Sequence, residues 1–129
     1  MAALSASAHE LIDGTNFATL ATIQPDGQPQ LSVVWVTREG DDVLISTLEG
    51  RRKHLNVARD PRVTLLIHPL GNAYSYLEIR GTATQSPEGG RELIDALSVK
   101  YTGEPYSADK PGDVRVVVRV TPERVVERN

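Results

Sequence analysis

The chain has 129 residues, of which 40% are hydrophobic, and a formal net charge of −3 at pH 7. This size suits one compact domain with its own core. The absence of cysteine excludes disulfides, thiolate metal sites and cysteine nucleophiles, and it fits a reducing compartment. The first ten residues do not resemble a signal peptide, and no apolar run is long enough to span a bilayer. We therefore expect a cytoplasmic protein that does not enter a membrane.

The N-terminal half predicts one short helix followed by strands. Ser5 or Ser7 can cap the helix, and Gly14 is placed to end it in a C′ position. Three segments rich in β-branched residues follow, separated by turn residues such as Pro25-Asp26-Gly27-Gln28. These segments are residues 17–23, 31–37 and 43–48. Because both connections are short, we expect a meander of three hairpin-linked strands.

The second half predicts two helices among further strands. Residues 52–59 lack β-branched enrichment, Leu55 and Ala58 share one possible helical face, and Asp60-Pro61 stops the helix. A second helix, residues 87–101, has an apolar stripe. The expected strands are 62–68, 74–84, 114–120 and 124–127. This content predicts a mainly β fold with a few short helices, a closed β-barrel that occupies residues 1–129 as a single domain.

The segment from Ser46 to Asn56 carries the clearest chemical signal. Two hydroxyls at a strand end, Ser46 and Thr47, precede a glycine turn, three cations in a row and the start of the first predicted helix after the strands. A helix N-terminus favours an anion, and arginine and lysine suit phosphate. Lys53 and Asn56 are three residues apart, so they leave one helical face. The pattern indicates a phosphate site, and the alternative is a solvated basic helix end.

The distribution of charge narrows the class of ligand. Five basic residues lie between positions 51 and 62, with one acid, so the rest of the chain is acidic. A protein that binds duplex nucleic acid is expected to be basic over a whole face. Aromatic residues are 5% of the chain, too few for the stacking platforms that bind single strands. We expect a small anionic ligand and no nucleic acid.

Several segments together resemble the flavin split-barrel family, which includes pyridoxamine-phosphate oxidases and the actinobacterial deazaflavin-dependent reductases. The resemblance runs from about Asn16 to Thr84 and more loosely to the C-terminus. The matching segments are Phe17-Ala18-Thr19-Leu20-Ala21-Thr22, Asp26-Gly27-Gln28-Pro29, Ser46 to Asn56, Arg59-Asp60-Pro61-Arg62-Val63 and Glu78-Ile79-Arg80-Gly81-Thr82-Ala83.

The resemblance implies a split β-barrel, a cofactor and an activity. The spacing Gly50-Arg51-x-Lys53-x-x-Asn56 looks like the branch that uses coenzyme F420, a deazaflavin, although Arg52-Lys53 would also serve the phosphate of FMN. The family implies a homodimer with the cofactor in a groove between two barrels. It also implies a reductase that transfers a hydride from the reduced deazaflavin to a small unsaturated organic substrate, with the protein supplying orientation and electrostatics.

On that resemblance we assign candidate residues to the cofactor. Arg51, Lys53 and Asn56 hold the phosphate end, Ser46 and Thr47 add hydroxyl contacts, and Arg52 is a weaker candidate. Trp35, the only tryptophan, either packs in the core or stacks near the ring system. No catalytic residue can be named from spacing. The three histidines, His9, His54 and His68, lack ligand spacing, so no metal site is expected.

Two alternatives stay open at this point. One is an FMN-dependent, pyridoxamine-phosphate-oxidase-like flavoprotein on the same fold. The other is a non-catalytic protein that binds or stores the same cofactor but leaves no productive cavity beside the ring.

Overall fold

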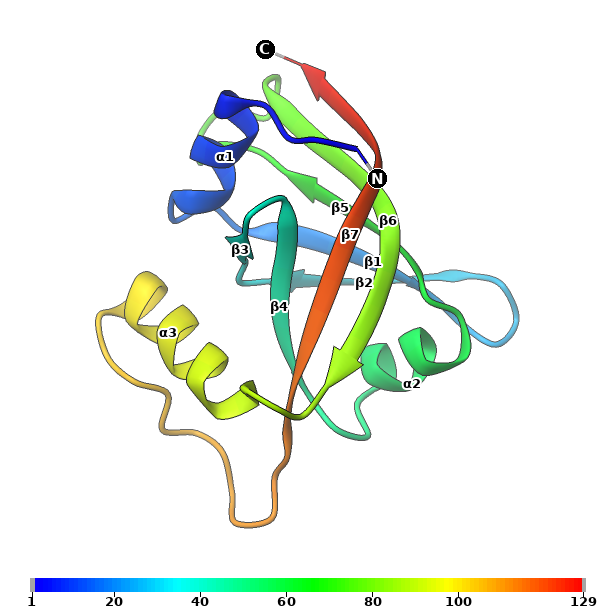
Figure 1. Cartoon of the computed structure of the whole chain (residues 1–129), viewed down its shortest axis with the longest axis vertical. Coiled ribbons are helices and arrows are strands. Elements are labelled where there is room, and N and C mark those ends of the chain that lie inside the picture. The colour runs from blue at the N-terminus through cyan, green and yellow to red at the C-terminus, as the bar shows by residue number, and fades with distance from the viewer. Residues whose placement is uncertain (1, 129) are drawn as a thin grey trace.

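The computed structural model describes residues 2–128, so Met1 and Asn129 of the predicted domain lie outside the described residues. Three helices surround one strongly curved antiparallel sheet (Figure 1). The elements in chain order are α1 (Ala6–Asp13), β1 (Ala18–Ile23), β2 (Pro29–Val34), β3 (Thr37–Glu39), β4 (Asp42–Leu48), α2 (Arg52–Arg59), β5 (Arg62–Ile67), β6 (Tyr76–Ser86), α3 (Gly90–Thr102) and β7 (Arg115–Arg128). The predicted mainly β fold is confirmed.

The sheet has the strand order β2-β1-β5-β6-β7-β4-β3, with all neighbours antiparallel. Its two edge strands, β2 and β3, are consecutive in the chain and only two residues apart. The sheet must therefore curl until its edges approach each other, which produces a barrel. The two segments predicted at the C-terminus are one strand, β7, whose pairing with β6 shifts register between Arg80 and Gly81.

The predicted meander is wrong at its second strand. Residues 31–37 do not run as one strand, because the chain breaks at Trp35-Val36 and β2 and β3 pair with different neighbours. The cause lies in α3. The backbone N–H of Val36 donates to Tyr101 Oη at 3.2 Å, and the Val36 carbonyl accepts from Lys100 Nζ at 2.6 Å. Two side chains thus replace the ladder partners that a continuous strand would use.

The helices begin and end close to their predicted bounds. Ser5 is the N-cap of α1, and its Oγ accepts from the Ala8 N–H at 3.1 Å. Gly14 follows the helix, but its φ of −71° is not the left-handed value expected of a C′ glycine. On α2, the apolar Leu55 is 44% exposed, and the buried residues are Asn56 and Val57.

The core fills the interior of the barrel. Each of β1, β4 and β6 buries alternate residues, as expected for strands with one face toward a core. The largest fully buried side chains are Ile12, Leu20, Ile45, Leu65, Ile67, Leu77, Ile79, Leu97, Val36, Val43, Val118 and Val120. None of the helices among residues 2–128 is long and apolar enough to cross a membrane.

Candidate functional site

A groove of about 250 Å³ lies where the end of β2, the start of α2 and the start of β7 meet α3. Its apolar wall consists of Val33, Val34, Ile94 and Leu97. Its polar and aromatic lining consists of Trp35, Ser46, Arg51, Lys53, Tyr106 and Arg115. The groove therefore joins an apolar and aromatic surface to a group of three cations.

Local backbone geometry presents two of these cations to the groove. Gly50 has a φ of 91°, a left-handed value that favours glycine, and it turns the chain from β4 into α2. Arg51 is then the N-cap, and no side chain caps the helix. The first N–H groups of α2 and the positive end of its dipole add to the side-chain charges. The turn therefore concentrates positive charge at this side of the groove.

Lys53 is half-buried, and its pKa is lowered. Burial is the largest cause, and repulsion from Arg51 and Arg115 adds to it. An anion in the groove would relieve this repulsion. The donor set of the Arg51 guanidinium, the Lys53 ammonium and the Ser46 hydroxyl thus fits a phosphorylated cofactor.

The structure does not bring all of the predicted residues into the groove. Ser46 lines it, but Thr47, the next residue on β4, faces the core and is 1% exposed, because successive strand residues point to opposite faces. Asn56 is fully buried, and its Nδ2 donates to Thr22 Oγ1 at 3.0 Å and to Gln24 Oε1 at 3.2 Å. Arg52 is exposed and is not part of the lining.

Trp35 lies at the wall of the groove and is also part of an aromatic cluster. Its ring stacks on that of Tyr101, with centroids 5.4 Å apart and planes 7° apart, and it meets Tyr106 edge-on at 6.3 Å. The two roles considered for Trp35, packing and a position beside the cofactor, are compatible in this geometry. Its fluorescence should report on ligands in the groove.

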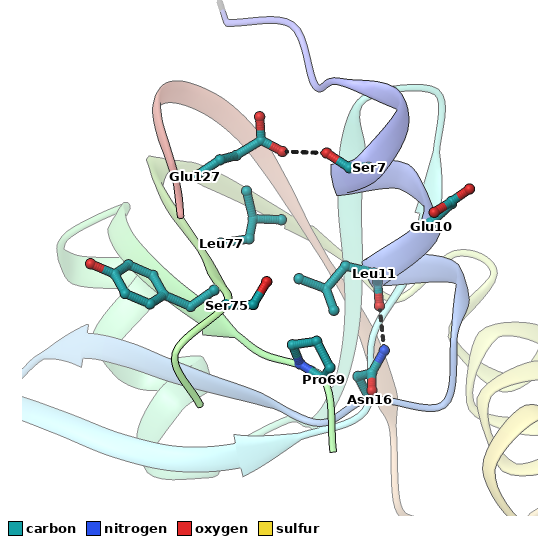
Figure 2. Close-up of a pocket in the computed structure, with 9 residues that line it drawn as sticks. Ser7, Glu10, Leu11, Asn16, Pro69, Ser75, Leu77 and Glu127 are labelled. Carbon is teal, nitrogen blue, oxygen red and sulfur yellow. Dashed lines mark hydrogen bonds between the residues drawn. The ribbon is translucent and has the colours of Figure 1, made fainter. Parts of the chain in front are cut away.

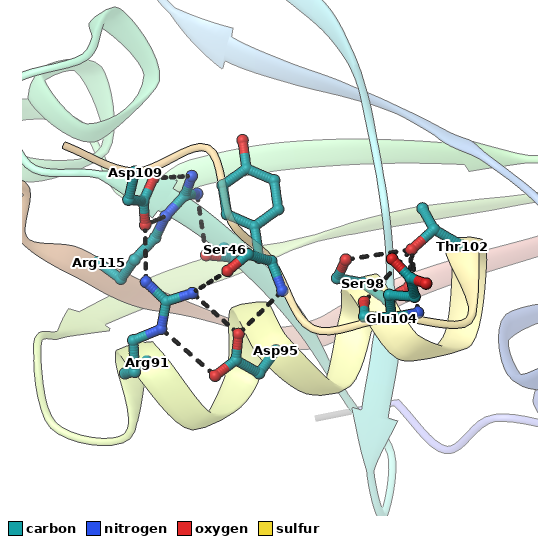
Figure 3. A network of polar contacts seen from close by, with 9 residues as sticks. Ser46, Arg91, Asp95, Ser98, Thr102, Glu104, Asp109 and Arg115 are labelled. Carbon is teal, nitrogen blue, oxygen red and sulfur yellow. Dashed lines mark hydrogen bonds and ion pairs between the residues drawn. The ribbon is translucent and has the colours of Figure 1, made fainter.

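Three further residues of this region, Tyr106, Asp109 and Arg115, were not identified from the sequence. The Arg115 guanidinium donates to both carboxylate oxygens of Asp109, at 2.8 and 2.7 Å (Figure 3). It also approaches Ser46 Oγ at 3.4 Å and lies 4.7 Å from the centre of the Tyr106 ring. The one signal in the sequence is an arginine that immediately precedes a run of valines on β7. A charge at that position needs a buried partner, which Asp109 provides.

The loop that carries Tyr106 and Asp109 is fastened to α3. The Asp95 carboxylate accepts from the backbone N–H of Tyr106 at 3.0 Å. Arg91 donates to the Tyr106 carbonyl at 2.9 Å and to Asp109 at 3.2 Å. α3 itself can approach β7 closely because residue 90 is glycine: a Cβ there would overlap the Arg115 carbonyl. This network holds one side of the groove in place.

A second cavity, of about 270 Å³, lies between α1, β6 and the end of β7 (Figure 2). Its lining includes two carboxylates, Glu10 and Glu127. Ser7 Oγ donates to Glu127 at 3.2 Å, and Asn16 Nδ2 donates to the Leu11 carbonyl at 3.0 Å. Because its charged groups are acidic, this cavity is unsuited to a phosphate.

The histidines have local partners. His9 Nε2 lies 2.7 Å from Asp41 Oδ1, His54 Nδ1 accepts from the Gly50 N–H at 3.0 Å, and His68 Nδ1 contacts the Pro69 carbonyl. Within residues 2–128, no three histidine, aspartate or glutamate side chains are grouped so that they could hold a metal ion.

An exposed apolar surface adjoins the groove. Leu31 and Val33, on β2, are 63% and 70% exposed, and Leu66, on β5, is 41% exposed. Val33 and Leu66 both pair with Thr19 of β1, on either side of it, so these side chains lie on one outward face of three strands. Val33 also lines the groove. The apolar face and the groove are thus continuous.

The chain is similar to known proteins over nearly its whole length. A family model described as pyridoxamine 5'-phosphate oxidase matches residues 4–129. An F420 reductase is similar at 26% identity and a TM-score of 0.83, over 95% of this chain and 98% of that one. A conserved hypothetical protein, Rv2991, from Mycobacterium tuberculosis is similar at 27% identity and a TM-score of 0.81, over 100% and 86%.

A more distant structure supports the fold alone. General Stress Protein 26 from Bacillus anthracis shares 16% identity at a TM-score of 0.69, over 92% of this chain and 88% of that one. The expected split-barrel fold is confirmed by the family match and these structures together.

Proposed function

Because the chain belongs to the pyridoxamine 5'-phosphate oxidase family, whose members bind flavin cofactors, we propose that it is a reductase that uses coenzyme F420. The observation that carries the proposal is the convergence of Arg51 and Lys53 on a groove that Trp35 also lines. The similarity to an F420 reductase favours the deazaflavin over FMN. When bound, the reduced deazaflavin supplies a hydride for a small unsaturated substrate.

The residues of this chain bind and orient the cofactor in this proposal. Arg51 and Lys53 hold its phosphate, with the Ser46 hydroxyl as a further donor, and the N-terminus of α2 adds its dipole. Val33, Val34 and Trp35 provide an apolar and aromatic surface for the ring system. Thr47, Asn56 and Arg52 lie outside the groove lining, and this proposal assigns them no contact with the cofactor.

We further propose that the protein is a homodimer with the groove at its interface. A groove of about 250 Å³ in one chain is smaller than a complete nucleotide-type cofactor, so other atoms must cover the rest of the ligand. The apolar face of Leu31, Val33 and Leu66 adjoins the groove and exposes the kind of surface that partners bury. Sedimentation of the protein with Leu31→Asp and Val33→Asp should show monomers where the unsubstituted chain sediments as a dimer.

The primary test is a titration of the purified protein with F420 and with FMN, followed through Trp35 and cofactor fluorescence. Tight binding of F420 and weak binding of FMN support the proposal, and loss of reduced F420 with candidate substrates then identifies the reaction. The reverse preference would move the protein to the FMN alternative. Binding of F420 without turnover of any unsaturated substrate would favour a storage protein.

The cation assignment is tested by Lys53→Ala. We expect it to weaken cofactor binding by about 1.5–3 kcal/mol, the contribution typical of a hydrogen bond to a charged group. Arg52→Ala is the matched control. It removes a cation from the same helix turn, but the Arg52 side chain is exposed and lies outside the groove lining. Equal losses in the two variants would show that the cluster attracts the ligand only through its general charge.

A further inference from the structure

Arg115 lines the groove and forms an ion pair with Asp109 behind it. The Arg115 side chain is 7% exposed and that of Asp109 is 10% exposed. Two parallel N–H···O bonds, of 2.8 and 2.7 Å, join them. Arginine binds phosphate oxygens with the same paired geometry that it uses for a carboxylate. Asp109 thus takes the contacts that Arg115 would otherwise offer to a phosphate.

Asp109 belongs to a loop rather than to a helix or strand. It lies between α3 and β7, and three bonds hold this part of the chain: two from Arg91 and one to Asp95 (Figure 3). The pKa of Asp109 is lowered by its hydrogen bonds from Arg115 and by the charges of Arg115, Arg91 and Arg51. Asp109 is therefore an anion that interacts with two of the cations around the groove.

This carboxylate changes the charge that a ligand meets. Arg51, Lys53 and Arg115 line the groove, and the Asp109 charge offsets that of Arg115. Repulsion between Asp109 and the phosphate held near it grows with the charge of that phosphate. A phosphomonoester carries a charge of about −1.5 to −2 near neutral pH, whereas a phosphodiester carries one negative charge. Asp109 should therefore disfavour the phosphomonoester of FMN more than the phosphodiester of F420.

We propose that Asp109 is a specificity-determining residue that masks Arg115 and so directs the groove away from ligands with a phosphomonoester. The inference rests on the proposed function, since it concerns which phosphorylated cofactor the same groove accepts. It assigns a role to a residue outside the segment from Ser46 to Asn56. It also predicts that replacing Asp109 raises the affinity for FMN. If Asp109 had only a structural role, its replacement would lower that affinity.

The test compares Asp109→Asn with the unsubstituted protein for three ligands: FMN, riboflavin and F420. Cofactor fluorescence gives each dissociation constant. We expect the affinity for FMN to rise by about tenfold or more, the effect of removing one nearby like charge. The affinity for F420 should rise by a smaller factor. Riboflavin has the same ring as FMN but no phosphate, so its binding should not change.

Asp95→Asn is the matched control. It removes a carboxylate from the same network, but Asp95 bonds to Arg91 and to the Tyr106 N–H rather than to Arg115. It should leave the ratio of FMN to riboflavin affinity as it is in the unsubstituted protein. Weaker FMN binding by Asp109→Asn, or an equal shift in both variants, would overturn the proposal.

Thermal melting in the presence of inorganic phosphate provides a second measurement that needs no cofactor. Asp109→Asn leaves the Arg115 charge buried without its partner, so the variant should melt at a lower temperature in plain buffer. Phosphate should raise its melting temperature more than that of the unsubstituted chain. Failure of phosphate to do so would refute the role of Asp109, whereas an unsubstituted protein that binds neither F420 nor FMN would refute the proposed function instead.

Discussion

The break between β2 and β3 is held by the Tyr101 hydroxyl together with Lys100, and Tyr101→Phe removes the hydroxyl. Tyr101 Oη accepts from the Val36 N–H at 3.2 Å and donates to the Asn16 carbonyl at 2.5 Å. Val36 is 0% exposed, so its N–H cannot turn to water when the hydroxyl is lost. The phenylalanine ring keeps the shape that stacks on Trp35. The substitution therefore isolates the loss of hydrogen bonds from any loss of packing.

The expected cost is about 1–3 kcal/mol of unfolding free energy, the penalty for one buried polar group without a partner. The Asn16 carbonyl adds less, because Asn16 is only partly buried. Urea denaturation at neutral pH, followed by circular dichroism, measures the change. Tyr74→Phe is the control, because Tyr74 is 87% exposed. A loss below about 0.5 kcal/mol, the range of ordinary surface substitutions, would show that the chain breaks for another reason.

Two further predictions concern α2 and the residues after it. Asn56→Ala should lower the unfolding free energy by about 1–3 kcal/mol, because Thr22 and Gln24 lose their buried donor; a loss of cofactor affinity with unchanged stability would instead support a contact with the phosphate. The side-chain hydrogen bond from Arg62 is the main cause that lowers the pKa of Asp60 to about 2. The stabilisation that this hydrogen bond gives the folded protein is present above the ordinary pKa of 3.8 and is lost as the pH falls toward 2. Because Arg62→Gln removes the charged donor, an NMR titration of this variant should show an Asp60 pKa closer to 3.8.

The parts of the fold that were predicted correctly depend on neighbours in the sequence. α2 was expected at 52–59 and found there, because Gly50 turns the chain before it and Asp60-Pro61 ends it. The face that α2 buries, by contrast, depends on residues far from it in the sequence. Leu55 is apolar yet exposed, whereas Asn56 is buried because Thr22 and Gln24, on another part of the chain, satisfy its amide.

The break within residues 31–37 shows a second limit of prediction from sequence. Its β-branched residues do favour extended backbone, and β2 and β3 are both strands. Whether they form one strand or two depends on Lys100 and Tyr101, which bind the backbone of Val36 from more than 60 residues away. Local strand propensity carries no information about contacts between residues so far apart in the sequence. A pattern of strands can therefore be correct while their pairing is wrong.

The candidate site was also predicted mainly where its residues are close together in the sequence. Arg51 and Lys53 were predicted from a helix N-terminus with adjacent cations, a pattern that favours an anion, and both line the groove. Arg115 was not predicted, because its position depends on the antiparallel pairing of β4 with β7, in which Leu48 lies opposite Arg115. That register places the first residue of β7 beside the end of β4, where α2 begins. The groove therefore acquires its third cation from sheet topology, and Asp109, the residue that offsets this cation, must come from the loop that leads into β7.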